Sequence, residues 1–262
     1  RQILDFYRDA SNDARRYLSD SYNVVTGNPT LLNSEYQQEE ATDPTSRAQL
    51  AVANVALDYG IENNNDTYIR FAFNLLQRSF DFMPDMERGG ITHLIPVESI
   101  QTDYFESLPT VSDSYSVKTN AEAYFIFMKF SDVLNGIDPA NLSEDLGALR
   151  ELTDQSLNSQ NVWLDMVWER IMAHPDDLVP DRFMVIINNQ LLSEGDTLQE
   201  ELVEEPWSSS DSVLSYIRVM QQRGADVDIL RSLIDNLNRA NRTEVDGRIG
   251  IDRTLPIGER GD

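Results

Sequence analysis

Apolar residues recur at helical spacing along most of this chain, and this periodicity restricts its fold more than any other feature. Side chains three and four positions apart share one face of a helix, so the pattern predicts amphipathic helices that each bury one stripe. It runs through residues 3–18, 44–59, 66–80, 119–130, 146–152, 162–171, 211–220 and 226–237. We therefore expect a mainly α protein, either a helical bundle or an irregular array of helical hairpins.

One predicted helix has a specific start signal. Thr119 and Glu122 have the Thr-x-x-Glu spacing of a capping box, in which each side chain accepts a hydrogen bond from the backbone amide of the other residue. A strongly apolar run with Phe127 and Phe130 follows at once. We expect this helix to lie at the centre of the bundle.

One stretch, "RFMVIINNQLLSEGDT" at residues 182–197, alternates with the period of a β-strand. Its asparagine pair tolerates the positive φ of a tight turn, so we expect a small β-meander near residues 182–202. Both faces of the first strand are apolar and must be covered by helices or by another molecule. These faces carry Phe183, Val185 and Ile187 on one side and Met184 and Ile186 on the other.

The remaining segments suggest how the chain is divided. Residues 83–117 contain Pro and Gly and lack a sustained period, so we expect irregular structure there with one short strand at "GITHLIPV". We expect a helical domain at residues 1–178. A smaller subdomain at residues 179–262 would hold the β-hairpin, two helices and an extended C-terminal tail.

Charge excludes one class of partner. The chain has 45 acidic and 21 basic residues and a formal charge of −24, and Lys118 and Lys129 are its only lysines. Because such a chain repels a phosphate backbone, we expect no nucleic-acid partner. Two explanations of the acidity remain open. One is adaptation to a salty environment, where salt screens the repulsion between like charges. The other is a bias in base composition.

The cellular setting is constrained only loosely. The chain has no cysteine, and it has no apolar stretch of about 18 residues that could span a bilayer. Because it begins with Arg1 rather than methionine, we expect either a preceding segment that has been removed or a boundary within a longer protein. These features favour an extracytoplasmic or virion location.

Signals for catalysis are weak. The chain has two histidines, His93 and His174, and neither lies in a metal-binding spacing. The stretch "RTEVDGRIGIDR" resembles a calcium loop but has Arg242 and Arg253 where carboxylate ligands belong. There is no phosphate-binding loop, dinucleotide fingerprint or nucleophile elbow, so we expect no catalytic residue, metal or cofactor.

We therefore expect a non-enzymatic structural or interaction module of a larger extracytoplasmic or virion assembly, adapted to a salty environment. Its partner would be another protein or further copies of the same chain. The expected contact surfaces are the meander and the segment 83–117. Within and beside the meander, the expected binding residues are Phe183, Val185, Ile187 and Trp207.

Two alternatives remain. A carboxylate-dependent hydrolase of the glycoside type would use a pair of acids, such as Glu39 and Glu40 or Asp176 and Asp177, in a cleft lined by Trp163, Trp168 or Trp207. A soluble carbohydrate- or peptide-binding module would have a cleft without a convergent acid pair.

Overall fold

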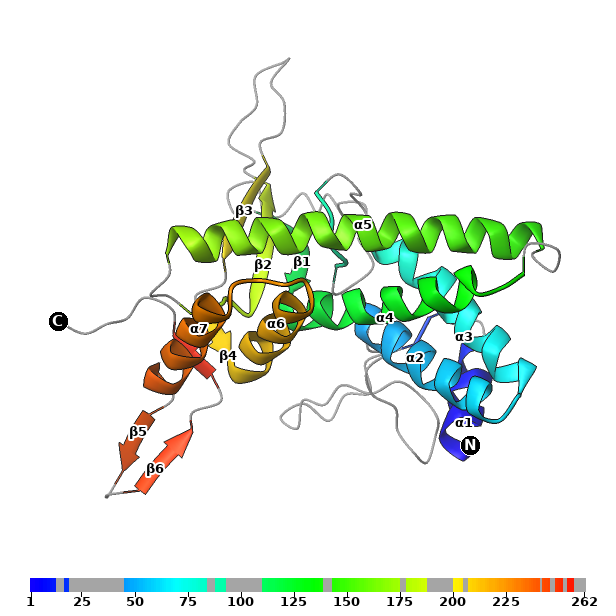
Figure 1. Ribbon diagram of the computed structural model, residues 1–262, viewed down its shortest axis with the longest axis horizontal. Coiled ribbons are helices and arrows are strands. Elements are labelled where there is room, and N and C mark those ends of the chain that lie inside the picture. Colours follow the sequence, from blue (N-terminus) through cyan, green and yellow to red (C-terminus); the bar gives the residue numbers. More distant parts are fainter. Residues whose placement is uncertain are drawn as a thin grey trace, which may run out of the picture.

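A computed structural model of the chain shows an elongated, mainly helical molecule (Figure 1). The structure describes residues 1–12, 17–18, 45–83, 88–92, 110–138, 143–174, 178–187, 200–204, 207–240, 242–245, 248–251 and 254–256. The helices within these ranges confirm the mainly α prediction. They are α1 (Gln2–Asn12), α2 (Ser46–Glu62), α3 (Asp66–Ser79), α4 (Val117–Asn135), α5 (Glu144–Ala173), α6 (Ser210–Gln222) and α7 (Val227–Ala240), with a 3-10 turn, η1 (Phe80–Phe82), after α3.

The long helix α5 organises the molecule. It crosses most of the view and lies above α4 over part of its length, with α1, α2 and α3 near one end and α6 and α7 near the other (Figure 1). Two separate helices were predicted here, and that prediction is wrong because α5 is continuous over 30 residues. The polar stretch between the two predicted helices contains neither Gly nor Pro, so nothing in it breaks the helix. Among the described helices, none is both long enough and apolar enough to span a membrane.

Helix α4 begins earlier than the sequence predicted. Ser116 is its N-cap, and the Ser116 Oγ accepts a hydrogen bond from the Thr119 amide at 3.3 Å. The predicted cap at Thr119 is therefore wrong, because Thr119 lies inside the first turn and is buried. A tertiary contact accompanies the earlier start, since the Val117 amide donates to the Asp181 carbonyl oxygen at 2.9 Å.

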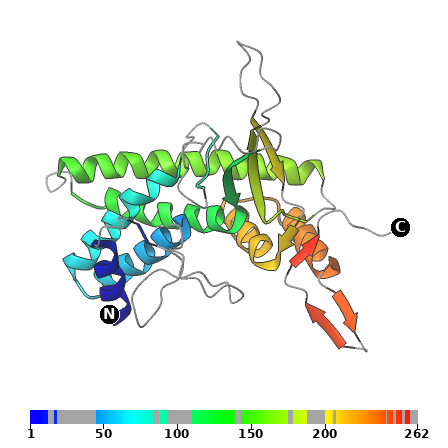
Figure 2. The same cartoon turned by 180° about the vertical axis from the view of Figure 1, so that it is seen from behind.

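The main sheet has three antiparallel strands in the order β1-β2-β3. Its strands are β1 (Thr110–Ser116), β2 (Arg182–Ile187) and β3 (Glu200–Glu204). Strand β2 is the first strand of the predicted meander, whereas the predicted turn and second strand lie outside the described residues. The irregular structure predicted for residues 83–117 is wrong over β1, which pairs with β2 and has a register shift between Val111 and Asp113. Seen from behind, these strands lie across α5 (Figure 2).

Two smaller pairs of strands lie near the C-terminus. Strand β4 (Trp207–Ser209) pairs with β7 (Thr254–Pro256), and β5 (Arg242–Val245) pairs with β6 (Arg248–Ile251). The strand predicted at "GITHLIPV" lies mostly outside the described residues, and its first residues, 90–92, are not in a strand.

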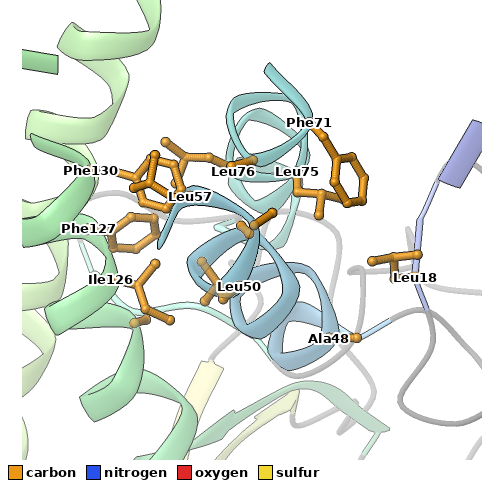
Figure 3. Packing of buried hydrophobic residues seen from close by; sticks show 14 of the residues in the cluster. Leu18, Ala48, Leu50, Leu57, Phe71, Leu75, Leu76, Ile126, Phe127 and Phe130 are labelled. Carbon is orange, nitrogen blue, oxygen red and sulfur yellow. The ribbon is translucent and has the colours of Figure 1, made fainter. Parts of the chain in front are cut away.

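The first hydrophobic cluster joins α1, α2, α3 and α4. Figure 3 shows Leu50 and Leu57 of α2 lying between the α3 side chains and the aromatic side chains of α4. Phe127 of α4 is fully buried, and its ring stacks on that of Phe80 with 6.2 Å between centroids. Phe130 is also fully buried and contacts the Phe73 ring. These contacts place α4 at the centre of this cluster.

The second cluster lies at the other end of α5. It joins β1, the start of α4, the end of α5, β2, α6 and α7, so residues on both sides of position 178 share one core. Phe183 packs edge-on against Trp163 with 5.9 Å between ring centroids. The Tyr216 hydroxyl donates to the Leu164 carbonyl oxygen at 3.0 Å, and burial raises the pKa of Tyr216 well above its ordinary value.

A buried polar stretch of α5 lies between the two clusters. Ser156, Ser159 and Gln160 are buried, whereas Leu149 belongs to the first cluster and Trp163 to the second. These polar positions follow helical spacing and share one face of α5. The molecule therefore has two apolar cores, and both α4 and α5 contribute side chains to each of them.

A glycine pair lets the chain pass close to α5 beside this polar stretch. Gly89 and Gly90 have φ of +79° and +84°, and a Cβ on Gly89 would lie 2.2 Å from the Ser159 carbonyl oxygen. The next residue, Ile91, is held by the Asn120 side chain. The Asn120 Oδ1 accepts from the Ile91 amide at 2.7 Å, and its Nδ2 donates to the Ile91 carbonyl oxygen at 3.0 Å.

Helix α1 contacts α3 through a polar cluster. The Tyr68 hydroxyl donates to the Asp5 carboxylate at 2.5 Å, and Arg8 pairs with the same carboxylate at 3.2 Å. The hydrogen bond from Tyr68 holds the pKa of Asp5 below its ordinary value of 3.8, and the positive charge of Arg8 acts in the same direction. The same hydrogen bond, together with burial, raises the pKa of Tyr68 above 10.0.

We expect Tyr68→Phe to lower the free energy of unfolding at pH 7 by an amount that shrinks in acid and in strong alkali. The lowered pKa of Asp5 means that its stabilising effect is present above pH 3.8 and is lost as pH falls through the folded-state value. The raised pKa of Tyr68 means that its effect is present below pH 10.0 and is lost as pH rises through its folded-state value. Urea unfolding of both proteins at pH 7 and pH 3 measures the difference. An equal difference at both pH values would assign the loss to packing.

Candidate functional site

The structure places one of the predicted binding residues in the core. Phe183 is fully buried against Trp163, so in the isolated chain its side chain belongs to the second cluster and is not exposed for contact. Val185 and Ile187 lie in β2, opposite Leu202 and Glu200 of β3, and Trp207 begins β4. The side chains of these three residues lie outside the described part of the structure.

Of the residues expected for a hydrolytic cleft, only Trp163 and Trp168 have described side chains. Trp163 is fully buried in the second cluster, and Trp168 is half-buried against the same cluster. The paired acids at 39–40 and 176–177 lie outside the described residues. His174 is an exposed residue at the C-terminal end of α5, and no group of three or more metal-ligating side chains occurs in the described ranges.

A groove between α2, α4 and α6 is the candidate functional site. It encloses about 350 Å³ and is open to solvent on one side. Buried Leu50 and Ile126 contribute to its floor, and exposed Val55 and half-buried Phe125 contribute further apolar surface. The complete lining is Arg47, Leu50, Ala51, Asn54, Val55, Thr119, Glu122, Phe125, Ile126, Lys129 and Arg218.

The charge of the groove is opposite to the charge of the chain. Its lining contains three cationic side chains, from Arg47, Lys129 and Arg218, and one carboxylate, from Glu122, which makes a formal balance of +2. The whole chain carries −24. A groove that gathers cations beside apolar surface attracts carboxylates, and its low-dielectric walls strengthen that attraction.

Lys129 is held in place by α2. Its Nζ donates to the Asn54 Oδ1 at 2.7 Å and forms an ion pair with Asp58. These contacts connect α4 to α2 beside the groove. The ammonium has three hydrogens, so it can bind a further acceptor after these two contacts.

The two arginines of the groove come from different helices. The Arg218 guanidinium of α6 lies over the Phe125 ring with 4.8 Å from its carbon to the ring centroid, which orients the side chain. Arg47 is exposed in the first turn of α2. Neither arginine forms an ion pair with a described carboxylate, whereas other described cations such as Lys118, Arg170 and Arg223 do.

Sequence reasoning did not find this groove. Its residues lie between positions 47 and 218, and each one alone is typical of an ordinary surface or helix position. One weak signal was present, because Lys129 is one of only two lysines and lies within the aromatic-rich helix α4. The convergence of three cations depends on how α6 packs against α4, which local patterns do not encode.

Comparison of the chain with protein-family models, with characterised proteins and with solved structures finds no match. A function for this chain is therefore proposed from the residues that line the groove and from their charges.

Proposed function

We propose that this chain is a non-enzymatic interaction module that binds an acidic segment of a partner protein in the groove between α2, α4 and α6. The observation that carries the proposal is the gathering of Arg47, Lys129 and Arg218 beside apolar surface in a chain of charge −24. Carboxylates of a partner would pair with these cations. The apolar floor would bury apolar side chains of the same segment.

The lining of the groove supports binding over hydrolysis. Glycoside hydrolysis of the common type uses two carboxyl groups that face each other across the substrate, and this groove has one, Glu122. The groove is likewise more cationic than the binding of a neutral carbohydrate requires.

We expect an acidic peptide to bind the groove and a basic peptide not to bind. The probes are labelled twelve-residue peptides of leucine and alanine with glutamate, glutamine or lysine, and the readout is fluorescence anisotropy with the full chain. The double variant Arg47→Ala with Arg218→Ala should weaken binding of the glutamate peptide by about tenfold, since each exposed ion pair contributes up to about 1 kcal/mol.

The matched control for this experiment is Arg70→Ala with Arg231→Ala, which removes two exposed arginines outside the groove. It should leave the affinity unchanged. Equal affinities for the glutamate and glutamine peptides, or equal losses in both double variants, would overturn the proposal.

The setting that we propose is a larger extracytoplasmic or virion assembly in a salty environment. Its support is the composition, with 45 acidic residues and two lysines. Close like charges on the folded chain repel less as salt screens them, so the thermal unfolding midpoint should rise from low to molar salt. A midpoint that stays flat or falls over this range would remove the proposal of a salty environment.

A further inference from the structure

The side chains that line the groove follow helical spacing on both of its long walls. On α2 they are at positions 47, 50, 51, 54 and 55, which share one face over about two turns. On α4 they are at positions 119, 122, 125, 126 and 129, which share one face over almost three turns. One face of α2 and one face of α4 therefore line the groove.

Its length fits a short helix. At 1.5 Å per residue, the lining positions extend about 12 Å along α2 and about 15 Å along α4. A helix of about 8 to 10 residues covers this distance. Rows of side chains on such a helix can pack between the rows on α2 and α4, as they do where helices pack in protein cores.

Backbone hydrogen bonding favours a helical occupant over an extended one. The long walls are helices, whose backbone N–H and C=O groups are bonded within α2 and α4. An extended segment would find no strand edge there for its own backbone groups, and the Asn54 side chain already accepts from Lys129. A helix satisfies its backbone groups internally and presents only side chains to the groove.

The chemistry of the groove defines the two faces of this helix. Leu50, Val55 and Ile126 offer apolar contact within the groove. The cations are spread along the groove, with Arg47 in the first turn of α2, Lys129 beside Asn54 about two turns later, and Arg218 over Phe125. A matching helix has one apolar stripe flanked by carboxylates.

We propose that the groove binds an acidic amphipathic helix of a partner protein, in the manner of a helix laid into a hydrophobic groove. This inference rests on the proposed function, because it names the form of the acidic segment. The partner's apolar stripe contacts the floor, and its carboxylates pair with Arg47, Lys129 and Arg218.

The test uses three labelled peptides, measured by anisotropy against the full chain. Two of them have one composition of glutamate, leucine and alanine, and the third differs from the first at one position. The first has leucines at helical spacing, the second has leucines at alternate positions, and the third is the first with a central alanine replaced by proline. We expect the first to bind at least tenfold tighter than the others. Its circular dichroism at 222 nm should show added helix on binding.

A pair of valine variants tests the apolar contact. Val55→Ser removes a 54% exposed side chain from the groove, and Val162→Ser removes a 48% exposed side chain from α5 outside it. Val55→Ser should weaken binding of the helical peptide severalfold, and Val162→Ser should leave its affinity unchanged. Circular dichroism of each variant establishes that it is folded.

The outcomes separate the two proposals. Equal affinities for all three peptides, with a loss in the Arg47→Ala and Arg218→Ala double variant, would leave acidic binding in place and overturn the helical form. Equal effects of the two valine variants would also overturn it. Failure of every acidic peptide to bind would overturn both proposals.

Discussion

Replacing Gly89 with alanine should lower the free energy of unfolding by about 3 kcal/mol or more. Two effects combine in this variant. An alanine at φ +79° occupies the left-handed region that L side chains avoid, and its Cβ would lie 2.2 Å from the Ser159 carbonyl oxygen. That oxygen belongs to the backbone of α5, which joins both hydrophobic clusters, so it cannot move away without disturbing them. Urea unfolding followed by circular dichroism measures the loss.

Gly224 provides the matched control. It has a similar φ of +80°, but a Cβ there would meet no atom within 4 Å. Gly224→Ala should therefore lower the free energy of unfolding by only about 1 kcal/mol, from backbone conformation alone. If both variants lower the free energy of unfolding by the same amount, the close approach of residue 89 to α5 does not contribute to the loss.

The second large effect is expected from Phe127→Ala, which should lower the free energy of unfolding by about 3 to 5 kcal/mol. Phe127 is fully buried in the first cluster and stacks on Phe80, so its removal leaves a cavity among α2, α3 and α4. Chemical denaturation gives the difference directly. The control is Val162→Ala on exposed α5 surface, which should change stability by less than about 0.5 kcal/mol. A nearly neutral Phe127→Ala would mean that α4 is not the centre of the bundle.

Local signals predicted most helices because helices depend on neighbouring residues. Helix α6 contains the predicted stretch 211–220, and Ser209 is its N-cap, with its Oγ accepting from the Ser212 amide at 3.2 Å. The predicted stretch 162–171 forms the last part of α5, which ends at Ala173. The strand at residues 182–187 was also predicted, because its alternation contrasts with the helical periods around it.

The errors arose where distant segments meet. The cap of α4 is Ser116 rather than Thr119, and the Val117 amide at this start is bonded to Asp181, 64 residues away. The polar face of α5 indicated a break, yet Gln160 is buried within one continuous helix. Strand β1 has a weak alternation of its own and forms because β2 provides an edge for its backbone.

The sequence by itself determined the helical class, the acidity, the position of the strand at residues 182–187 and the buried aromatic centre of α4. The acidity follows from composition alone. The other properties depend on the spacing of side chains within one segment, because a helix repeats every 3.6 residues and a strand alternates its side chains between two faces. Only the tertiary structure decided that β2 lies between β1 and β3, and that Phe183 packs on Trp163. It also brought Arg47, Lys129 and Arg218 to one groove. Those contacts join segments far apart in sequence, and their geometry follows from how α5 and α4 pack the two cores together.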